Sequence, residues 1–232
     1  MKFRLIVFDV DGTLIPSDKP MSCDVSVTLR HFENLGIRIA LSSGKHFQYI
    51  EGVARDLGIK RPIIIAENGC IIVDVVYNKE VWLTKRTPEI REIREKILSK
   101  FSDFTREQPN KVEFTVFPKT VALLPEIISY ARELNNQYGN RIHMYEYAGY
   151  LDILPASIDK GAGLAEIKRM YGFKKEEVAA IGDGENDIPM FKEAGLSLIV
   201  GTQISYPDAM SFHTIEEALD FLKKNMKQSS KQ

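Results

Sequence analysis

Two aspartates lie two residues apart where the first apolar run of the chain ends. The run LIVF at residues 5–8 is followed by Asp9, and Asp11 comes just before Gly12. Alternation along an extended chain points both carboxylates to one side, about 6 to 7 Å apart. Because like charges this close raise one pKa, the pair suits one carboxylate for nucleophilic or metal-binding work and one for proton transfer. An ordinary Asp-Gly turn at a strand exit is the structural alternative.

A second acidic cluster, GDGEND at residues 182–187, also follows an apolar run and opens a helical pattern. Asp183 and Asp187 could converge on one cation. Oxygen ligands without Cys or His favour Mg²⁺ over zinc, and Mg²⁺ in such sites keeps waters and contacts substrate phosphate. The alternative is a helix N-terminus rich in acids because the helix dipole favours them, which would explain Glu185 and Asn186 better than the two aspartates.

Two further segments could hold an anion. Ser43-Gly44-Lys45 lies between a strand pattern and a helix pattern, where a hydroxyl and exposed backbone N–H groups could bind phosphate. Lys160 opens the helical pattern near residue 160, where an ammonium could neutralise phosphoryl charge. Helix capping by the serine and a solvated surface lysine are the alternatives.

The elements that must position these residues alternate along the chain. Apolar runs at residues 3–8, 37–41, 62–66, 178–181 and 196–200 predict buried parallel strands, and helical periodicity predicts helices near 25–35, 47–57, 160–171, 188–193 and 215–224. This alternation predicts an α/β fold with a doubly wound, Rossmann-like parallel sheet. Each candidate residue follows a predicted strand or begins a helix, so we expect all of them at one edge of that sheet.

The alternation of strands and helices is interrupted between Ser43-Gly44-Lys45 and Lys160. Residues 70–77 and 81–84 predict a hairpin with its turn at residues 78–80, followed by helices at 87–101 and 125–138 and strands at 112–117, 141–147 and 151–154. This pattern predicts an inserted α+β cap domain at residues 85–154, with the core formed by residues 1–84 and 155–232.

Composition narrows the class of protein. The chain has 232 residues, 44% of them hydrophobic, and 31 basic against 32 acidic side chains, as in ordinary globular proteins. The net charge of −1 argues against a nucleic-acid partner. No apolar stretch approaches the roughly 18 residues of a membrane span, and we expect no membrane partner. Cys23 and Cys70 lack a CxxC spacing, which favours free thiols in a cytoplasmic protein.

Taken in order, four segments resemble the motifs of the haloacid dehalogenase superfamily of phosphatases. They are DVDGT at 9–13, Ser43-Gly44-Lys45, Lys160 within SIDKG, and GDGEND at 182–187. The insertion resembles a type-2 cap, and Glu67-Asn68-Gly69 before a hairpin is similar to the Cof-type branch. The short cap and the phrase GDGENDIPMF resemble the archaeal-type phosphoglycolate phosphatases. Lys45 departs from the arginine that many Cof-type members carry.

The resemblance implies Mg²⁺-dependent hydrolysis of a small phosphorylated metabolite, with 2-phosphoglycolate as the first candidate. It implies that Asp9 forms an aspartyl-phosphate and that Asp11 acts as acid and then base. The implied magnesium ligands are Asp9, the Asp11 backbone carbonyl, Asp183 and Asp187, the last directly or through water. Ser43, Gly44 and Lys160 would bind the phosphoryl oxygens.

The cap residues and the substrate stay more open. A substrate carboxylate needs a cationic partner, for which Arg106 is the first candidate and Arg141 and His143 follow. A sugar-phosphate phosphatase or phosphomutase is the alternative activity, and a catalytically silent binding protein is a second alternative. The sequence leaves open whether the protein is a monomer or a homodimer.

Overall fold

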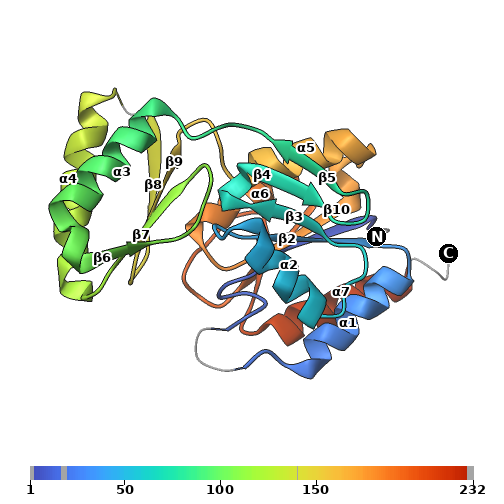
Figure 1. The fold of residues 1–232 in the computed structure, drawn as a ribbon. Coiled ribbons are helices and arrows are strands. Elements are labelled where there is room, and N and C mark those ends of the chain that lie inside the picture. Colours follow the sequence, from blue (N-terminus) through green and yellow to red (C-terminus); the bar gives the residue numbers. More distant parts are fainter. Residues whose placement is uncertain (1–2, 17–19, 140, 229–232) are drawn as a thin grey trace.

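Two sheets of unequal size organise the chain. The computed structural model describes residues 3–16, 20–139 and 141–228. Within these residues, an eight-stranded sheet forms the larger unit and a four-stranded sheet forms the smaller one. Figure 1 shows the smaller unit at one end of the strands of the larger sheet.

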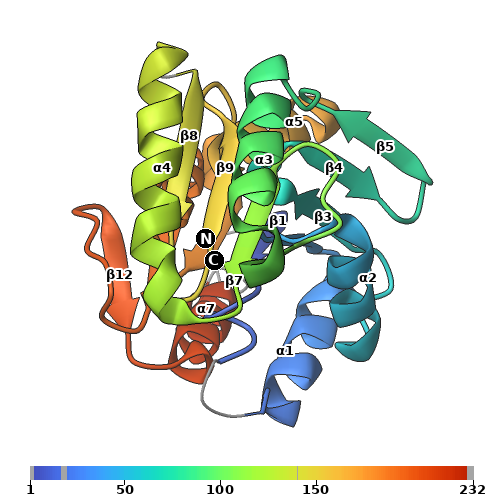
Figure 2. The same cartoon turned by 60° about the vertical axis from the view of Figure 1, so that its left-hand side comes forward.

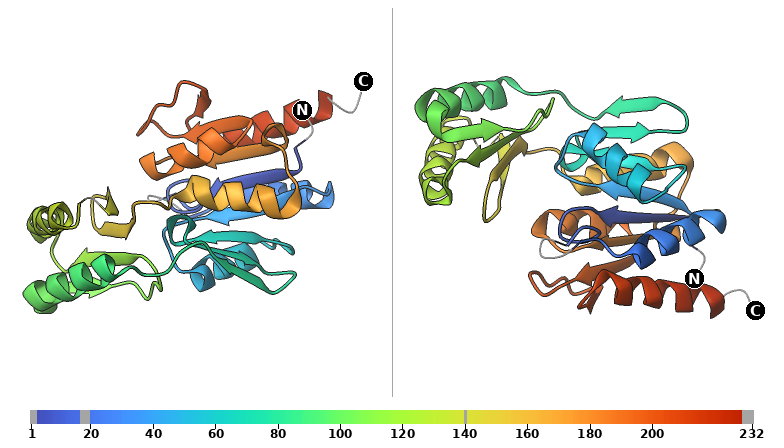
Figure 3. Two further views of the ribbon diagram at one scale, coloured as in Figure 1. Left: turned by 90° about the horizontal axis from the view of Figure 1, so that it is seen from above. Right: turned by 60° about the horizontal axis from the view of Figure 1, so that its bottom comes forward.

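The larger sheet is doubly wound. Its strand order is β12 (Ala209–Phe212), β11 (Leu196–Val200), β10 (Val178–Gly182), β1 (Leu5–Asp9), β2 (Arg38–Ser42), β3 (Ile63–Ala66), β4 (Ile71–Asp74) and β5 (Lys79–Trp82). Strands β12 to β3 run parallel, whereas β4 and β5 are antiparallel additions. Helices α1 (Cys23–Asn34), α2 (Phe47–Asp56) and α7 (Ile215–Gln228) cover one face, and α5 (Lys160–Tyr171) and α6 (Ile188–Glu193) cover the other (Figures 1 and 3). The α/β prediction is confirmed.

Strand β1 is buried on both faces, which explains why its sequence is a continuous apolar run. Ile6 and Phe8 pack into the cluster formed with α1, α2 and α7, whereas Leu5 and Val7 pack into the cluster formed with α5 and α6. All four side chains are fully buried. A strand that is covered on both faces has no solvent-facing position for a polar residue until it ends.

The smaller unit is an antiparallel sheet with helices on one side. Its order is β6 (Thr105–Glu107), β7 (Phe114–Pro118), β9 (Leu151–Pro155) and β8 (Ile142–Glu146). Helices α3 (Pro88–Phe101) and α4 (Leu124–Gln137) cover its outer face, as Figure 2 shows. The bare face turns toward the carboxyl ends of the parallel strands. The unit lies between β5 and α5 in the sequence, in the position expected of a cap.

Some local predictions were wrong. The hairpin turn lies at residues 75–78 rather than 78–80, because the Asp74 carboxylate accepts hydrogen bonds from the N–H groups of Val76 and Tyr77 and so starts the turn earlier. Asn78 ends it with a φ of 47°. Strands β6 and β12 were not predicted, and α7 runs to Gln228 instead of ending near residue 224. Both missed strands are short, and β12 is a half-exposed edge strand.

Two further observations concern the described residues only. No helix among them is both long enough and apolar enough to cross a bilayer. Cys23 is exposed and Cys70 is buried, and both are free thiols.

Candidate active site

The candidate residues meet at the carboxyl edge of the parallel sheet. Asp9 ends β1, Ser43 follows β2, Asp183 follows β10 and Lys160 begins α5. A cavity of about 120 Å³ opens between this edge and the cap. The residues that line it are Asp9, Asp11, Ser43, Gly44, Lys45, Gln108, Tyr147, Tyr150, Asp152, Asp183, Gly184, Asn186 and Gln203.

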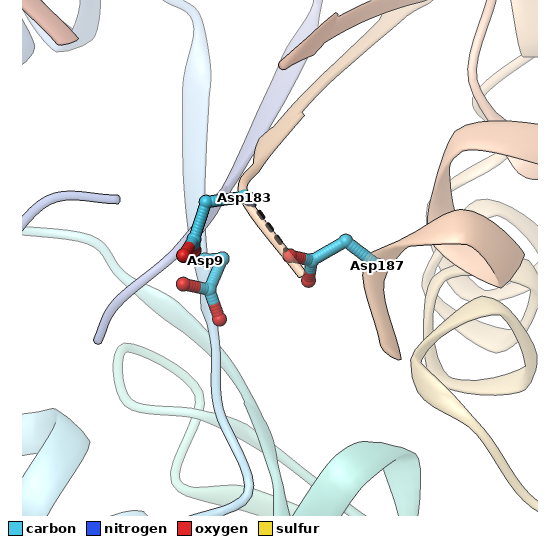
Figure 4. A group of neighbouring side chains, drawn as sticks. All are labelled: Asp9, Asp183 and Asp187. Atoms are coloured by element: carbon cyan, nitrogen blue, oxygen red, sulfur yellow. Dashed lines mark hydrogen bonds between the residues drawn. The ribbon is translucent and has the colours of Figure 1, made fainter. Parts of the chain in front are cut away.

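Three carboxylates lie close together beside this cavity (Figure 4); Asp9 and Asp183 line it, and Asp187 is buried behind them. One oxygen from each of Asp9, Asp183 and Asp187 lies within 4.8 Å of the others. The orientation of each is held by neighbours: Asp187 Oδ2 accepts hydrogen bonds of 3.0 Å from the backbone N–H groups of Asp183 and Gly184. The Thr13 hydroxyl donates to Asp183 Oδ1 at 2.8 Å. Asp187 Oδ2 therefore closes the start of the short 3-10 helix at Glu185–Asp187, while Asp187 Oδ1 stays turned toward Lys160 and the other carboxylates.

Lys160 is the cation that the cluster holds. Its side chain is fully buried, and its Nζ lies 2.5 Å from Asp9 Oδ1 and 2.6 Å from Asp187 Oδ1. Burial lowers the pKa of the ammonium, but the charges of Asp187 and Asp9 outweigh burial and raise it above its usual value. Asp159 positions the lysine by accepting a hydrogen bond from the Ala162 N–H at the start of α5. The surface-lysine alternative is wrong.

The donor set fits a divalent cation. Asp9 Oδ2 is buried and has no hydrogen-bond partner among the described residues, although Asp9 Oδ1 is paired with Lys160. Burial raises the pKa of Asp9, Lys160 opposes the rise, and Asp187 and Asp183 add to it. Burial and the charge of Asp187 likewise raise the pKa of Asp183. A hard cation ligated by these oxygens would relieve both the repulsion and the missing contact.

Asp11 lines the same cavity but stands apart from the three clustered carboxylates. Its Oδ2 accepts a hydrogen bond of 3.0 Å from the Ser43 hydroxyl, and its Oδ1 accepts one of 3.4 Å from the Tyr49 hydroxyl. Lys45 Nζ lies 3.8 Å away. A half-exposed carboxyl beside the cavity is placed to exchange protons with a bound molecule.

The Ser43-Gly44 loop is not a helix cap. His46 caps α2 by accepting a hydrogen bond from the Gln48 N–H, which leaves the Ser43 hydroxyl free to bond to Asp11. Gly44 has no space for a side chain, since a Cβ there would lie 2.8 Å from both Asn68 Nδ2 and Asp152 Oδ2. The chain therefore approaches these two side chains more closely than any other residue type would allow.

The cations that were predicted in the cap do not line the cavity. Arg106 on β6 is exposed, with its guanidinium 4.3 Å from the centre of the Phe117 ring. Arg141 is exposed and pairs with Glu89 at 3.0 Å, and His143 lines a neighbouring groove. The cavity receives Lys45 instead, from the loop after β2.

Sequence reasoning missed a polar junction between cap and core. Glu67 and Asn68 both have a φ of 51°, a backbone conformation that is strained in residues other than glycine. The Glu67 carboxylate accepts hydrogen bonds from the backbone N–H groups of residues 111–113 in the cap. Asn68 donates to Glu113 and Asp152 in the cap and accepts from Asn186 beside the acidic loop. Only the motif at 67–69 signalled this junction, and nothing in the sequence paired it with the cap residues.

A doubly wound core with clustered carboxylates and a buried lysine beneath a cap is the arrangement to compare with known hydrolases. The family model described as haloacid dehalogenase-like hydrolase matches residues 6–116 and 75–217. The chain belongs to this family.

Curated relatives and solved structures agree with this assignment. The chain is 31% identical over 201 residues to phosphoglycolate phosphatase 1 of Saccharolobus solfataricus, covering 85% of this chain and 82% of that protein. It is 32% identical over 200 residues to phosphoglycolate phosphatase of Metallosphaera sedula, covering 85% of each. A crystal structure from Thermoplasma acidophilum superposes with a TM-score of 0.80 at 20% identity, covering 98% of this chain and 99% of that one. A sugar phosphatase of subclass IIB of the superfamily gives a TM-score of 0.73 at 19% identity, covering 98% and 99%. The predicted family is confirmed, and the chain is a phosphatase, a hydrolase of phosphoric monoesters.

Proposed function

We propose that this phosphatase uses Mg²⁺ to hydrolyse a small phosphomonoester through an aspartyl-phosphate on Asp9, and that 2-phosphoglycolate is its first candidate substrate. The observation that carries the proposal is the arrangement around Asp9. One of its oxygens is paired with Lys160, the other is buried with no hydrogen-bond partner in the described part of the chain, and the carboxylates of Asp183 and Asp187 lie close by. An attacking carboxylate and a charge-neutralising site are thus held together before substrate arrives.

The chain's own residues divide the chemistry as follows. An Asp9 oxygen bonds to phosphorus as the bond from phosphorus to the leaving oxygen breaks, and Asp11 gives its proton to that oxygen. Asp11 then takes a proton from the water that attacks phosphorus, and the bond between phosphorus and Asp9 breaks. Ser43, the backbone around Gly44, and Lys160 bind the remaining phosphoryl oxygens. When bound, Mg²⁺ would be held by Asp9, the Asp11 carbonyl, Asp183 and Asp187, and it would offset the negative charge of the phosphoryl oxygens.

The choice of substrate rests on three observations. The curated relatives at about 30% identity are phosphoglycolate phosphatases by name. The cavity of about 120 Å³ lies well below the roughly 300–1,000 Å³ of pockets for drug-sized ligands, which favours a compact ester. Lys45 lines the cavity and can pair there with a substrate carboxylate. Arg106 is a candidate partner of that carboxylate if the cap closes further. Its pairing with Phe117 places it on the same face of the cap sheet as Thr115, which is the face turned toward the core domain.

A sugar-phosphate phosphatase or phosphomutase is the second candidate function. It is favoured by one feature of the cavity, the carboxyl group of Asp152, which suits a hydroxylated substrate better than a carboxylated one.

Phosphate release from 4-nitrophenyl phosphate and from phosphoglycolate tests the proposal, with Mg²⁺ or with a chelator. We expect release that needs Mg²⁺, and we expect Asp9→Asn to lower it by about 10³-fold or more with the fold intact. Asp56→Asn, at the exposed end of α2, is the matched control and should behave as the unmodified protein. Near-normal turnover by Asp9→Asn would remove Asp9 as nucleophile, and transfer of phosphate without release would indicate a mutase.

A further inference from the structure

Asp152 brings a cap carboxyl group into the cavity. It lies within β9, is 2% exposed, and lines the cavity with Gln108, Tyr147 and Tyr150 from the cap. Among these four it is the acidic one. Because the phosphoryl-binding groups belong to the core, the rest of a bound substrate faces the cap and meets this carboxyl group.

A second buried acid is linked to Asp152 through one hydroxyl. Thr115 Oγ1 lies 2.6 Å from Asp152 Oδ1 and 3.0 Å from Glu113 Oε1. A hydroxyl has one proton to donate, so both contacts are hydrogen bonds only if one of the two acids is itself protonated and donates to Thr115. Glu113 Oε1 also accepts a hydrogen bond of 2.9 Å from Asn110 Nδ2, which lies 3.2 Å from Thr115 Oγ1. Two buried acids thus compete for one hydroxyl proton, and because burial disfavours a negative charge on both, we expect the pair to hold one proton.

The surroundings show which acid holds that proton. Glu113 does not line the cavity and accepts hydrogen bonds from Asn68 and Asn110, whereas Asp152 lines the cavity and accepts the contact of 2.6 Å from Thr115. We therefore assign the ionised form to Asp152 and the neutral form to Glu113. Glu113 is fully buried, and burial together with the charge of Asp152 raises its pKa well above the usual value.

The surroundings of Asp152 hold its pKa near neutral pH. Burial raises the pKa, whereas hydrogen bonds from Thr115 and Asn68 and the charges of Lys45 and Lys160 lower it, and the result is a pKa of about 7. Tyr147 and Tyr150 are held neutral because burial raises the pKa of both phenols. The ionisable groups that face Asp152 are Glu113 from β7, Lys45 from the loop after β2, Lys160 from α5, and Tyr147 and Tyr150 from the loop between β8 and β9.

We propose that Asp152 selects substrates by the charge of their non-phosphate end, and that Glu113 is a positioning residue that holds the shared proton. The proposal rests on the proposed phosphatase function. Ionised Asp152 accepts a hydrogen bond from a substrate hydroxyl and repels a substrate carboxylate. Protonated Asp152 no longer repels the carboxylate and can donate to it.

The unmodified protein tests the proposal through a ratio of two substrates. Phosphoglycolate carries a carboxylate and sn-glycerol 3-phosphate carries hydroxyls, while the phosphoryl group is common to both, so its own titration largely cancels. We expect the ratio of kcat/KM for phosphoglycolate to that for glycerol phosphate to rise about tenfold from pH 8 to pH 6, because the protonated fraction of a group with a pKa near 7 rises about tenfold over that range. A ratio that does not change with pH overturns the proposal.

Two variants separate selection from a structural role. Asp152→Asn should abolish the pH dependence of the ratio and raise it at pH 8. Glu113→Gln should keep the midpoint of the pH profile, since the glutamine replaces an acid that is already neutral. A midpoint that moves far to lower pH in Glu113→Gln would show that Glu113 is the charged partner and overturn the assignment. Glu126→Gln, which removes one exposed charge from the outer side of the cap, is the charge-matched control.

The remaining outcomes distinguish the two proposals. Parallel changes for both substrates in Asp152→Asn overturn the selection role but leave the phosphatase function standing. Absence of Mg²⁺-dependent release from all three esters overturns both.

Discussion

Replacing the buried lysine isolates the electrostatic core of the site. Lys160→Met keeps the length and apolar stem of the side chain but leaves Asp9 and Asp187, formerly 2.5 and 2.6 Å from Nζ, without their cation. Removing one partner of a buried ion pair costs about 3–5 kcal/mol. At about 2–4 °C per kcal/mol for a protein of this size, we expect the unfolding midpoint to fall by about 6–20 °C in the presence of a chelator.

The loss should depend on pH in a defined direction. Burial already raises the pKa of Asp9 and Asp183, and losing Lys160 raises that of Asp9 further. A carboxyl whose pKa is raised in the folded state loses its contribution to stability as the pH rises from the unfolded-state pKa of about 4 through the raised folded-state pKa, so the penalty should be smaller near pH 5 than near pH 7.

Thermal and urea unfolding followed by circular dichroism measure this effect at both pH values. Added Mg²⁺ should restore part of the lost stability at pH 7, because a cation at the carboxylates replaces some of the missing charge. Lys168→Met on the same helix is the control; it removes the pair with Glu193 and should cost no more than about 1 kcal/mol. A change below about 1 kcal/mol for Lys160→Met, or a change equal at pH 5 and pH 7, would refute this account of the site.

Two pairs of substitutions test the geometry of the site. Gly12→Ala should abolish most activity, because Gly12 has a φ of 96° and a Cβ there would lie 2.4 Å from Asp183 Oδ2. Gly36→Ala is the control, because Gly36 has a φ of 84° and open space around it. The backbone strain should lower the stability of both variants by a similar amount, but Gly36→Ala should leave phosphate release intact. Equal activity in the two variants would show that catalysis does not depend on the close approach of Gly12 to the Asp183 side chain. Lys45→Ala should raise KM for phosphoglycolate much more than for 4-nitrophenyl phosphate, whereas a larger and equally selective effect of Arg106→Ala would show that the cap closes further over substrate.

Hydrophobic patterning predicted the core elements well for a physical reason. Strands such as β1 are covered on both faces, so their apolar runs are continuous and end where solvent or the site begins. Helix α3 was equally readable because Thr87 and Pro88 mark its start. Strand β6 is three residues long and exists through its pairing with β7, and β12 is a half-exposed edge, so neither carries a distinctive pattern of its own.

The sequence by itself determined which reactive side chains lie together at the carboxyl ends of the parallel strands. Asp9, Asp183 and Lys160 each follow or begin an element whose end lies at that edge, so their convergence follows from the alternation of strands and helices. Ser43 was placed at the same edge, but its bond to Asp11 in place of a helix cap came from the loop's tertiary contacts.

Only the tertiary structure decided what faces that chemistry from the cap. Asn68 meets Asp152 across 84 residues of sequence and Glu113 across 45, and the cavity receives Lys45 while Arg106 lies outside it. Such contacts depend on how two separately folded sheets pack against each other. Periodicity describes the burial of one element at a time, and it has no information about which polar residues of two distant elements will share a buried proton or a hydrogen bond.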